Sequence, residues 1–184
     1  PEAAPISGIR DREGDLITSD DEGNLIRVDP AGNETVLDIY CGVGTIGLLA
    51  SKKAGKVIGI ESVGEAVLDA NRNATINHIV NARYIKGSAE EVMPKLAADE
   101  YREDGIFLSG DVIAVLDPPR AGCDERLLES LVSLAPERVV YESCDAGTLA
   151  RDIKYLNKEG YQFIEATPVD MFPWTEHVEC VVLM

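Results

Sequence analysis

The sequence is poor in the residues that build metal sites and disulfide frameworks. Its 184 residues include only two histidines and four cysteines, and no two cysteines form a C-x-x-C pair. A secreted domain of this size would not rely on so sparse a set of thiols, so we expect reduced cysteines in a cytoplasmic protein. The same scarcity argues against a structural zinc site.

The chain also lacks long apolar stretches. No run approaches the roughly 18 residues that a membrane-spanning helix requires. The opening PEAAPISGIRDREGD has neither the basic nor the apolar region of a signal peptide. We therefore expect no membrane segment and no secretory leader.

Positive charge is scarce as well. Lys and Arg number 17 against 33 Asp and Glu, which gives a net charge of −16. A protein that holds nucleic acid by itself normally has a basic face, because affinity comes largely from neutralised phosphates. If the partner is RNA, most of the affinity must come from elsewhere, such as an RNA-binding module outside this chain. Solubility alone is an equally good explanation of the acidity.

What the sequence does contain, from Glu34 onward, is a regular alternation of β-branched runs and helical patterns. Strands that alternate with helices form crossover units, which predicts an α/β fold with a mainly parallel sheet covered by helices on both faces. Strands are expected at Thr35–Ile39, Val57–Glu61, Ala82–Lys86, Val112–Asp117, Arg138–Ser143, Phe163–Val169 and Val178–Leu183. Helices are expected near Ile46–Lys53, Gly64–Asn77, Ala89–Leu96, Glu125–Leu134 and Thr148–Leu156.

Local signals support some of these helices. Ser88 and Glu91 have the S-x-x-E spacing of a capping box. Asp124 is the expected N-cap of the fourth helix. In the second helix, Val63, Val67 and two alanines recur on one face, which predicts a buried stripe.

Residues 1–33 have a different pattern from residues 34–184. GDLITSDDEGNLIRVDP contains two short strand patterns around a Ser-Asp-Asp-Glu-Gly-Asn turn, which predicts an N-terminal β-hairpin. We therefore divide the chain into an N-terminal extension, 1–33, and one α/β domain, 34–184.

The stretch VLDIYCGVGTIGL places a glycine loop between a strand and a helix. Gly42, Gly44 and Gly47 satisfy G-x-G-x-x-G, and Glu61 ends the next strand. This is the dinucleotide fingerprint, so a nicotinamide-dependent oxidoreductase is one interpretation. A tight strand-to-helix turn that binds no ligand is another.

Asp38 favours a third interpretation. It lies at the carboxyl end of the strand, where the pyrophosphate of a dinucleotide would meet an unfavourable negative charge. A cationic ligand such as S-adenosylmethionine, with its ammonium and sulfonium groups, would be attracted. If the first and fourth strands flank the point where the strand order reverses, Asp38 and Asp117 converge there.

Five stretches together carry a family resemblance: LDIYCGVGTIGL, VIGIES, DPPRAGCDE, SCDAGTLARD and DMFPWTEHVE. In this combination and order, the chain from about Asn33 to Met184 resembles the catalytic domain of the RNA uracil-5-methyltransferases. These S-adenosylmethionine-dependent enzymes make 5-methyluridine in ribosomal or transfer RNA, and the chain looks most like the bacterial ribosomal-RNA members. The resemblance implies a Rossmann-like class I methyltransferase fold. Its sheet would have seven strands, mostly parallel, with an antiparallel last strand beside the fifth.

The resemblance also implies roles for individual residues. The nucleophilic thiol of the family's SC(N/D) motif falls on Cys144, and the general base of its FP-x-T-x-H-x-E motif falls on Glu179. Family positions that bind the methyl donor fall on Tyr40, Thr45, Glu61, Ser88 and Asp117, which join Asp38, Gly42 and Gly44 in the expected S-adenosylmethionine site.

The chemistry explains why one thiol and one carboxylate suffice. Carbon 5 of uracil is a poor nucleophile until a thiolate adds at carbon 6, and a base must then remove the carbon-5 proton. Cys144 precedes an expected helix start, where the helix dipole favours a thiolate, and Asp145 is available as the helix cap. Glu142 should lie on the same strand face as Cys144 and disfavour the thiolate.

Other residues have open interpretations. Cys123 is an alternative nucleophile or a buried small residue, whereas Cys41 and Cys180 are expected to be packing thiols. His177 alternates with Glu179, so it either orients that base or makes a structural hydrogen bond, and His78 is expected to end a helix. Phe172 and Trp174 could stack on a target base that has flipped out of its stack, or they could simply pack within their loop. Arg120 and Arg151 could contact phosphate or the uracil edge, or they could form ordinary surface ion pairs.

The sequence departs from the family in ways that keep a second hypothesis open. The family normally has an RNA-binding module, a central domain and a donor-contacting glutamine before the glycine strand, and none of these is found. Together with Glu142, this makes a donor-binding domain that is catalytically silent alone the main alternative to an active methyltransferase. The nicotinamide oxidoreductase is the third possibility.

Overall fold

A computed structural model describes residues 9–10, 16–19, 25–28, 32–171, 173–175 and 177–184, with side chains described from residue 32 onward. Its main feature is a seven-stranded sheet with the order β6-β5-β4-β7-β8-β10-β9. All neighbouring pairs from β6 to β8 are parallel, whereas β10 is antiparallel to both β8 and β9. The strands are β4 (Thr35–Ile39), β5 (Lys56–Glu61), β6 (Ala82–Lys86), β7 (Val112–Leu116), β8 (Arg138–Ser143), β9 (Glu165–Val169) and β10 (Glu179–Leu183).

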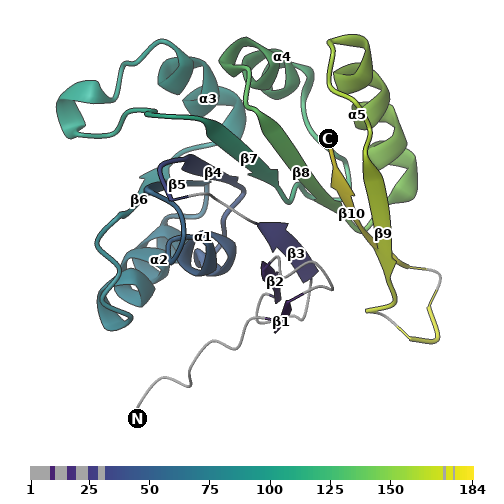
Figure 1. The fold of residues 1–184 in the computed structure, drawn as a ribbon, viewed down its shortest axis with the longest axis horizontal. Helices are drawn as coiled ribbons and strands as arrows, with labels where there is room; N and C mark the ends of the chain where they lie inside the picture. The colour runs from purple at the N-terminus through teal and green to yellow at the C-terminus, as the bar shows by residue number, and fades with distance from the viewer. Residues whose placement is uncertain (1–8, 11–15, 20–24, 29–31, 172, 176) are drawn as a thin grey trace.

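Helices cover both faces of this sheet (Figure 1). They are α1 (Thr45–Ala50), α2 (Gly64–Ile76), α3 (Ala89–Ala97), α4 (Glu125–Leu134) and α5 (Ala146–Lys158), with a short 3-10 helix at Arg102–Asp104. The central strands β4, β5 and β7 bury both faces, as expected for parallel strands in a doubly covered sheet, whereas the edge strand β9 is largely exposed. On one face, Leu37 and Leu116 pack with α3, α4 and α5, and on the other, Val36 and Val115 pack with α1 and α2. The predicted α/β fold with an antiparallel last strand is confirmed.

A second, three-stranded antiparallel sheet precedes the main one. Its strands are β1 (Ile9–Arg10), β2 (Leu16–Ser19) and β3 (Leu25–Val28), in the order β1-β2-β3. The pairing of β2 with β3 is that of the expected hairpin, and β1 adds a third strand that the sequence pattern did not predict. In space, β3 lies beside β8 and β10 of the main sheet (Figure 1).

Several element ends differ from the sequence expectation. Helix α1 ends at Ala50 rather than Lys53. Strand β9 begins at Glu165 rather than Phe163: the Ile164 amide still donates to the Leu183 carbonyl of β10 at 2.9 Å, but both Phe163 and Ile164 are exposed and precede the last residue pair of the ladder. Val63 precedes α2 and is exposed, so it does not belong to the buried stripe of that helix. No helix in the described ranges is long and apolar enough to cross a membrane.

Candidate functional site

The carboxyl ends of β6, β5, β4, β7 and β8 meet at one edge of the sheet because these strands are parallel. Strand order reverses between β4 and β7, which is the place where ligands bind in open α/β sheets. The order of the predicted site along this edge is therefore Ser88, Glu61, the glycine loop after Asp38, Asp117 and finally Cys144. Strands lie about 4.8 Å apart, so roughly 10 Å separates β4 from β8.

Asp38 is the most buried acid of the site. Its side chain is 0% exposed, and its Oδ2 accepts a hydrogen bond from the Gly47 amide at 2.8 Å, whereas Oδ1 has no hydrogen-bond partner among the described residues. Burial raises the pKa of Asp38 to about 7, the Gly47 amide opposes the rise, and Asp117 and Glu61 add to it. These three acids stand at or just beyond the carboxyl ends of β4, β5 and β7, which are neighbouring parallel strands.

Two amides of the glycine motif, those of Gly42 and Gly47, are already engaged by carboxylates, and the Gly44 amide donates to the Cys41 carbonyl at 2.7 Å. Glu61 Oε2 accepts from the Gly42 amide at 3.1 Å, as Asp38 does from Gly47. A dinucleotide pyrophosphate needs such amides for itself. This geometry therefore disfavours a nicotinamide nucleotide and favours a cationic ligand.

Tyr40 contacts the first turn of α3, the helix whose N-cap residue is Ser88. The hydroxyl of Tyr40 donates to Glu90 Oε1 at 2.8 Å, and Tyr40 has a left-handed backbone with φ of 68° at the end of β4. Ser88 is the N-cap residue of α3, but its side chain makes no capping hydrogen bond, so the predicted capping box is not formed. The hydroxyl of Ser88 therefore does not satisfy an amide of this helix.

Thr45 and Asp117 complete the predicted donor residues. Thr45 is the first residue of α1 and is half-buried, directly after the glycine loop. Asp117 follows β7 and is also half-buried, and its amide donates to the Ile39 carbonyl at 3.3 Å. This bond holds the exit of β7 beside the exit of β4.

Cys144 and Glu179 are brought together by the antiparallel pairing of β8 and β10. Cys180 pairs with Ser143, so continuing this register by one residue sets Glu179 opposite Cys144. Residues that lie opposite each other in an antiparallel pair project from the same face, with Cα atoms about 5 Å apart. Glu179 is buried and Cys144 is half-buried.

The N-terminal end of α5 adjoins Cys144. Asp145 is the N-cap residue, and its Oδ1 accepts from the Thr148 amide at 2.8 Å, as expected. This bond is the largest of the effects that lower the pKa of Asp145. The carboxylate next to the thiol is thereby engaged by the helix.

Two of the other three thiols are more buried than Cys144, whereas Cys180 is half-buried like Cys144. Cys41 and Cys123 are buried, and burial raises the pKa of Cys123 to about 12 and that of Cys41 still higher. Burial, followed by the charge of Glu179, raises the pKa of Cys180. A thiol this difficult to ionise is a poor nucleophile at neutral pH, which argues against Cys123 as the reactive residue.

Glu142 is almost fully buried, at 1% exposure. It pairs with Val181 across the β8–β10 ladder, so it lies on the same face as Glu179, diagonally across the two strands. Two buried carboxylates therefore flank the position of Cys144, and this juxtaposition is the feature that least suits a thiolate.

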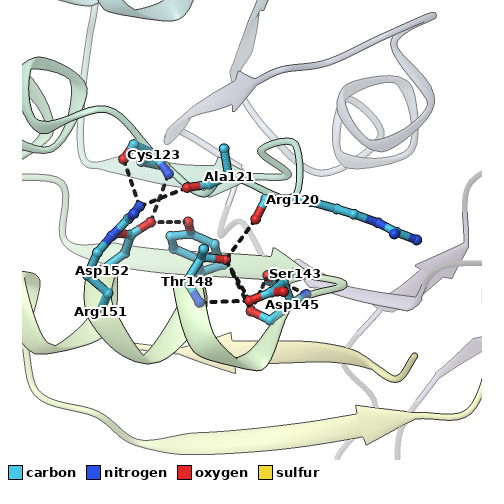
Figure 2. Close-up of polar contacts among 9 residues, drawn as sticks. Arg120, Ala121, Cys123, Ser143, Asp145, Thr148, Arg151 and Asp152 are labelled. Atoms are coloured by element: carbon cyan, nitrogen blue, oxygen red, sulfur yellow. Dashed lines mark hydrogen bonds and ion pairs between the residues drawn. The ribbon is translucent and has the colours of Figure 1, made fainter. Parts of the chain in front are cut away.

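The structure separates the remaining candidates. Arg151 is engaged in contacts with Asp152 and two loop carbonyls, whereas the side chain of Arg120 extends away from this cluster (Figure 2). The side chain of Trp174 is fully exposed, so it is not held by packing within its loop. His177 is half-buried near Glu179, and Phe172 lies outside the described residues.

Comparison with known sequences places the chain in a family. The model of the family described as tRNA (Uracil-5-)-methyltransferase matches residues 25–184. The chain belongs to this family. The match begins at Leu25 rather than near Asn33, so it includes β3, which lies within the predicted N-terminal extension 1–33.

This chain aligns with only part of the length of individual family members. An RNA methyltransferase of Bacillus cereus, named as uncharacterized, is 52% identical over 153 residues, which are 83% of this chain and 32% of that protein. A similarly named protein of Caldanaerobacter subterraneus is 48% identical, with the same coverage. The chain thus spans about a third of these relatives.

Solved structures agree with the family and the fold. The tRNA (uracil-54, C5)-methyltransferase of Pyrococcus abyssi, in complex with S-adenosyl-L-homocysteine, has a TM-score of 0.67 and 36% identity over 82% of this chain and 34% of that chain. An rRNA methylase of Streptococcus thermophilus has a TM-score of 0.61 at 14% identity, over 84% of this chain and 87% of that one. The second likeness concerns the fold alone.

Proposed function

We propose that this chain is the catalytic part of an S-adenosylmethionine-dependent RNA methyltransferase that acts on carbon 5 of uridine through a covalent cysteine adduct. The observation that carries the proposal is the register of β8 and β10, which sets Glu179 opposite Cys144 at the sheet edge that also holds the glycine loop. Membership of the family supports the same reaction.

The residues of the glycine loop fit the proposed donor. Asp38 is buried with one carboxylate oxygen lacking a hydrogen-bond partner among the described residues, and Asp117 and Glu61 are close enough to raise its pKa. Three acids in one place attract the ammonium and sulfonium charges of S-adenosylmethionine. When bound, the donor supplies the electrophilic methyl group. Tyr40, Thr45 and Ser88 are the further residues proposed to hold it.

In the proposed mechanism Cys144 and Glu179 carry out the steps on the base. The Cys144 thiolate forms a bond to carbon 6 of uracil, and the electron pair of the carbon 5–carbon 6 double bond moves into an enolate. Carbon 5 of this enolate then takes the methyl group as the bond between methyl and sulfonium sulfur breaks, and S-adenosylhomocysteine is the leaving group. The Glu179 carboxylate then removes the carbon-5 proton, the bond between carbon 6 and sulfur breaks, and the thiolate returns. The target base must leave its stack to reach this edge.

The covalent step is testable with RNA that contains 5-fluorouridine, in which the carbon-5 fluorine prevents the release step. Incubation with donor should give a protein–RNA adduct visible by denaturing electrophoresis and mass spectrometry. Cys144→Ala should abolish it, whereas Cys123→Ala, which removes a buried thiol, should leave it. With ordinary uridine, Glu179→Gln should accumulate the methylated adduct. No adduct with the unchanged chain, although donor binding is confirmed by calorimetry, would contradict an active enzyme.

A second candidate function is a donor-binding region that is silent without the rest of its protein. The burial of Glu142 on the face of Glu179 favours it, because a carboxylate beside the thiol disfavours the thiolate. Glu142→Gln separates the two possibilities. If the unchanged chain forms no adduct and this variant does, the silent function is supported.

The RNA partner follows from the family, and its class is part of the proposal. The motifs look most like ribosomal-RNA enzymes, whereas the family description and the Pyrococcus abyssi structure name transfer RNA. We propose that the part of the protein outside this chain provides the RNA-binding module. Methylation of ribosomal RNA fragments and of transfer RNA, measured side by side with the longer protein, would distinguish the two.

A further inference from the structure

The loop that leaves β7 is fastened to α5 by a charged pair. This loop, 117–123, runs from the donor acid Asp117 to the buried residue Cys123. Arg151 Nη2 donates to the carbonyl of Ala121 at 3.0 Å and to that of Cys123 at 3.1 Å, and Arg151 Nε donates to Asp152 Oδ1 at 2.7 Å. Figure 2 shows both side chains pointing from α5 toward the loop.

Asp152 connects three elements. It is 1% exposed, and its Oδ2 accepts from the Cys123 amide at 2.8 Å and from the Tyr141 hydroxyl at 2.7 Å. Tyr141 lies on β8, three residues before Cys144. One buried carboxylate thus joins the loop, the strand that ends at the nucleophile and the helix that follows it.

A second tie lies one helical turn earlier. The Thr148 hydroxyl donates to the Arg120 carbonyl at 3.1 Å, and the Thr148 amide donates to the Asp145 carboxylate at 2.8 Å. The loop is also closely seated, since a Cβ on Gly122, where φ is 74°, would lie 2.6 Å from both Arg151 Nη2 and Asp152 Oδ2. The loop therefore follows the position of α5.

We propose that Arg151 and Asp152 are positioning residues, which lock the 117–123 loop against α5 so that Asp117, on the donor side, and Cys144, on the base side, keep a fixed separation. This inference rests on the proposed function. Methyl transfer needs carbon 5 of the bound base within near-attack distance of the methyl group, and a misplacement of about 1 Å can cost about a hundredfold in rate. Packing alone would not require a buried charge, which is costly unless it is fully paired.

The test compares two arginine pairs in this chain. Arg151→Gln removes the contacts to the loop carbonyls, and Arg102→Gln makes the same change at an Arg102–Asp99 ion pair that lies on the surface beside the amino end of β5. Adduct formation is measured in a single turnover with saturating 5-fluorouridine RNA and S-adenosylmethionine. Donor affinity is measured by calorimetry, the thermal midpoint by scanning, and exchange of the loop amides by mass spectrometry.

We expect Arg151→Gln to slow adduct formation and transfer at saturation by at least about tenfold. Donor affinity should stay near that of Arg102→Gln and exchange at 120–123 should increase, while the thermal midpoint falls below that of Arg102→Gln because the buried Asp152 loses its charge partner. A purely structural role would lower donor affinity as well as the midpoint, with the rate at saturation preserved. Either that pattern or equal saturated rates in the two variants would overturn the proposal.

Asp152→Asn provides a second variant, with Asp99→Asn as its control. The two carboxylate oxygens of Asp152 both accept, so an amide in either orientation turns its NH₂ toward a donor that the carboxylate had satisfied. We expect the same loss of rate as with Arg151→Gln. If the unchanged chain forms no adduct while binding donor, the proposed function fails. The amide exchange measurement still tests whether Arg151 and Asp152 hold the loop, because equal exchange at 120–123 in variant and control would overturn that part of the proposal.

Discussion

At the scale of single residues, the protonation of Asp38 links donor binding to pH. Burial, with the charges of Asp117 and Glu61, holds its pKa at about 7 in the folded chain. A cationic donor favours the ionised carboxylate, so affinity for S-adenosylmethionine should increase by about tenfold from pH 6 to pH 8, as the ionised fraction does. Calorimetry at several pH values measures this, and Asp38→Asn should remove the increase. Parallel pH profiles for the two proteins would contradict the assignment.

The same residue makes a prediction about stability. The pKa of Asp38 is about 7 in the folded chain, whereas in the unfolded chain the carboxyl has its ordinary pKa of 3.8. Stability from this group is therefore greatest below pH 4 and is lost as the pH rises to 7, with a loss on the order of 4 kcal/mol. Asp38→Asn has no such titration. Urea unfolding across this range should show the free energy of unfolding of the variant rising relative to that of the unchanged chain as the pH increases. A difference in unfolding free energy that stays constant with pH would refute the prediction.

At the scale of elements, local patterns were sufficient for most of the main sheet. Ala82–Lys86 and Arg138–Ser143 have the bounds expected from their β-branched runs, and Glu125–Leu134 has the bounds expected from its cap and periodicity. The two-residue strand Ile9–Arg10 was missed because it is too short for alternation to be recognised. Ser88 shows the opposite error, since a capping sequence was present and the bond was not.

The candidate site was predictable where it depends on strand ends and motifs. Asp38 and Asp117 stand on neighbouring parallel strands that end at one edge, and the register of the antiparallel last strand sets Glu179 opposite Cys144. The contacts of Asp152 were not predictable, because its partner Cys123 is 29 positions away and no local spacing signals such a bond. A charged residue within a helical pattern, such as Asp152, is predicted to lie on the surface unless its tertiary contacts are known.

The glycine loop gives a prediction that separates backbone strain from crowding. Gly44 and Gly42 both have positive φ, at 83° and 51°, but a Cβ on Gly44 would lie 2.6 Å from Tyr84 Oη, whereas one on Gly42 would meet nothing within 4 Å. Gly42→Ala should cost only left-handed strain, about 1 kcal/mol. Gly44→Ala should cost about 1–3 kcal/mol more, because the buried Tyr84 must move. Chemical denaturation of both variants provides the comparison, and equal losses would mean that Tyr84 yields freely.

At the scale of the whole molecule, the net charge of −16 limits what this chain can do with RNA alone. Each phosphate that a protein neutralises on a single strand contributes about −0.7 to the slope of log affinity against log salt. With 33 acids against 17 bases we expect few neutralised phosphates and a slope between 0 and about −2. Most of the affinity would then have to come from the RNA-binding module proposed above.

Arg120 makes the salt dependence specific to a residue. Its side chain extends away from the anchored cluster (Figure 2), whereas Arg102 is paired with Asp99 beyond the opposite ends of the strands. If Arg120 contacts a phosphate, Arg120→Gln should reduce the slope of log affinity against log salt by about 0.7. The same variant should weaken the binding of uridine-containing oligonucleotides of different sequence by similar factors. Arg102→Gln should leave the slope unchanged. Fluorescence anisotropy from 50 to 300 mM salt, an interval of about sixfold, resolves such a change. An unchanged slope with weaker binding would instead place Arg120 on the uracil edge, and no change in either would leave this arginine outside the RNA contact.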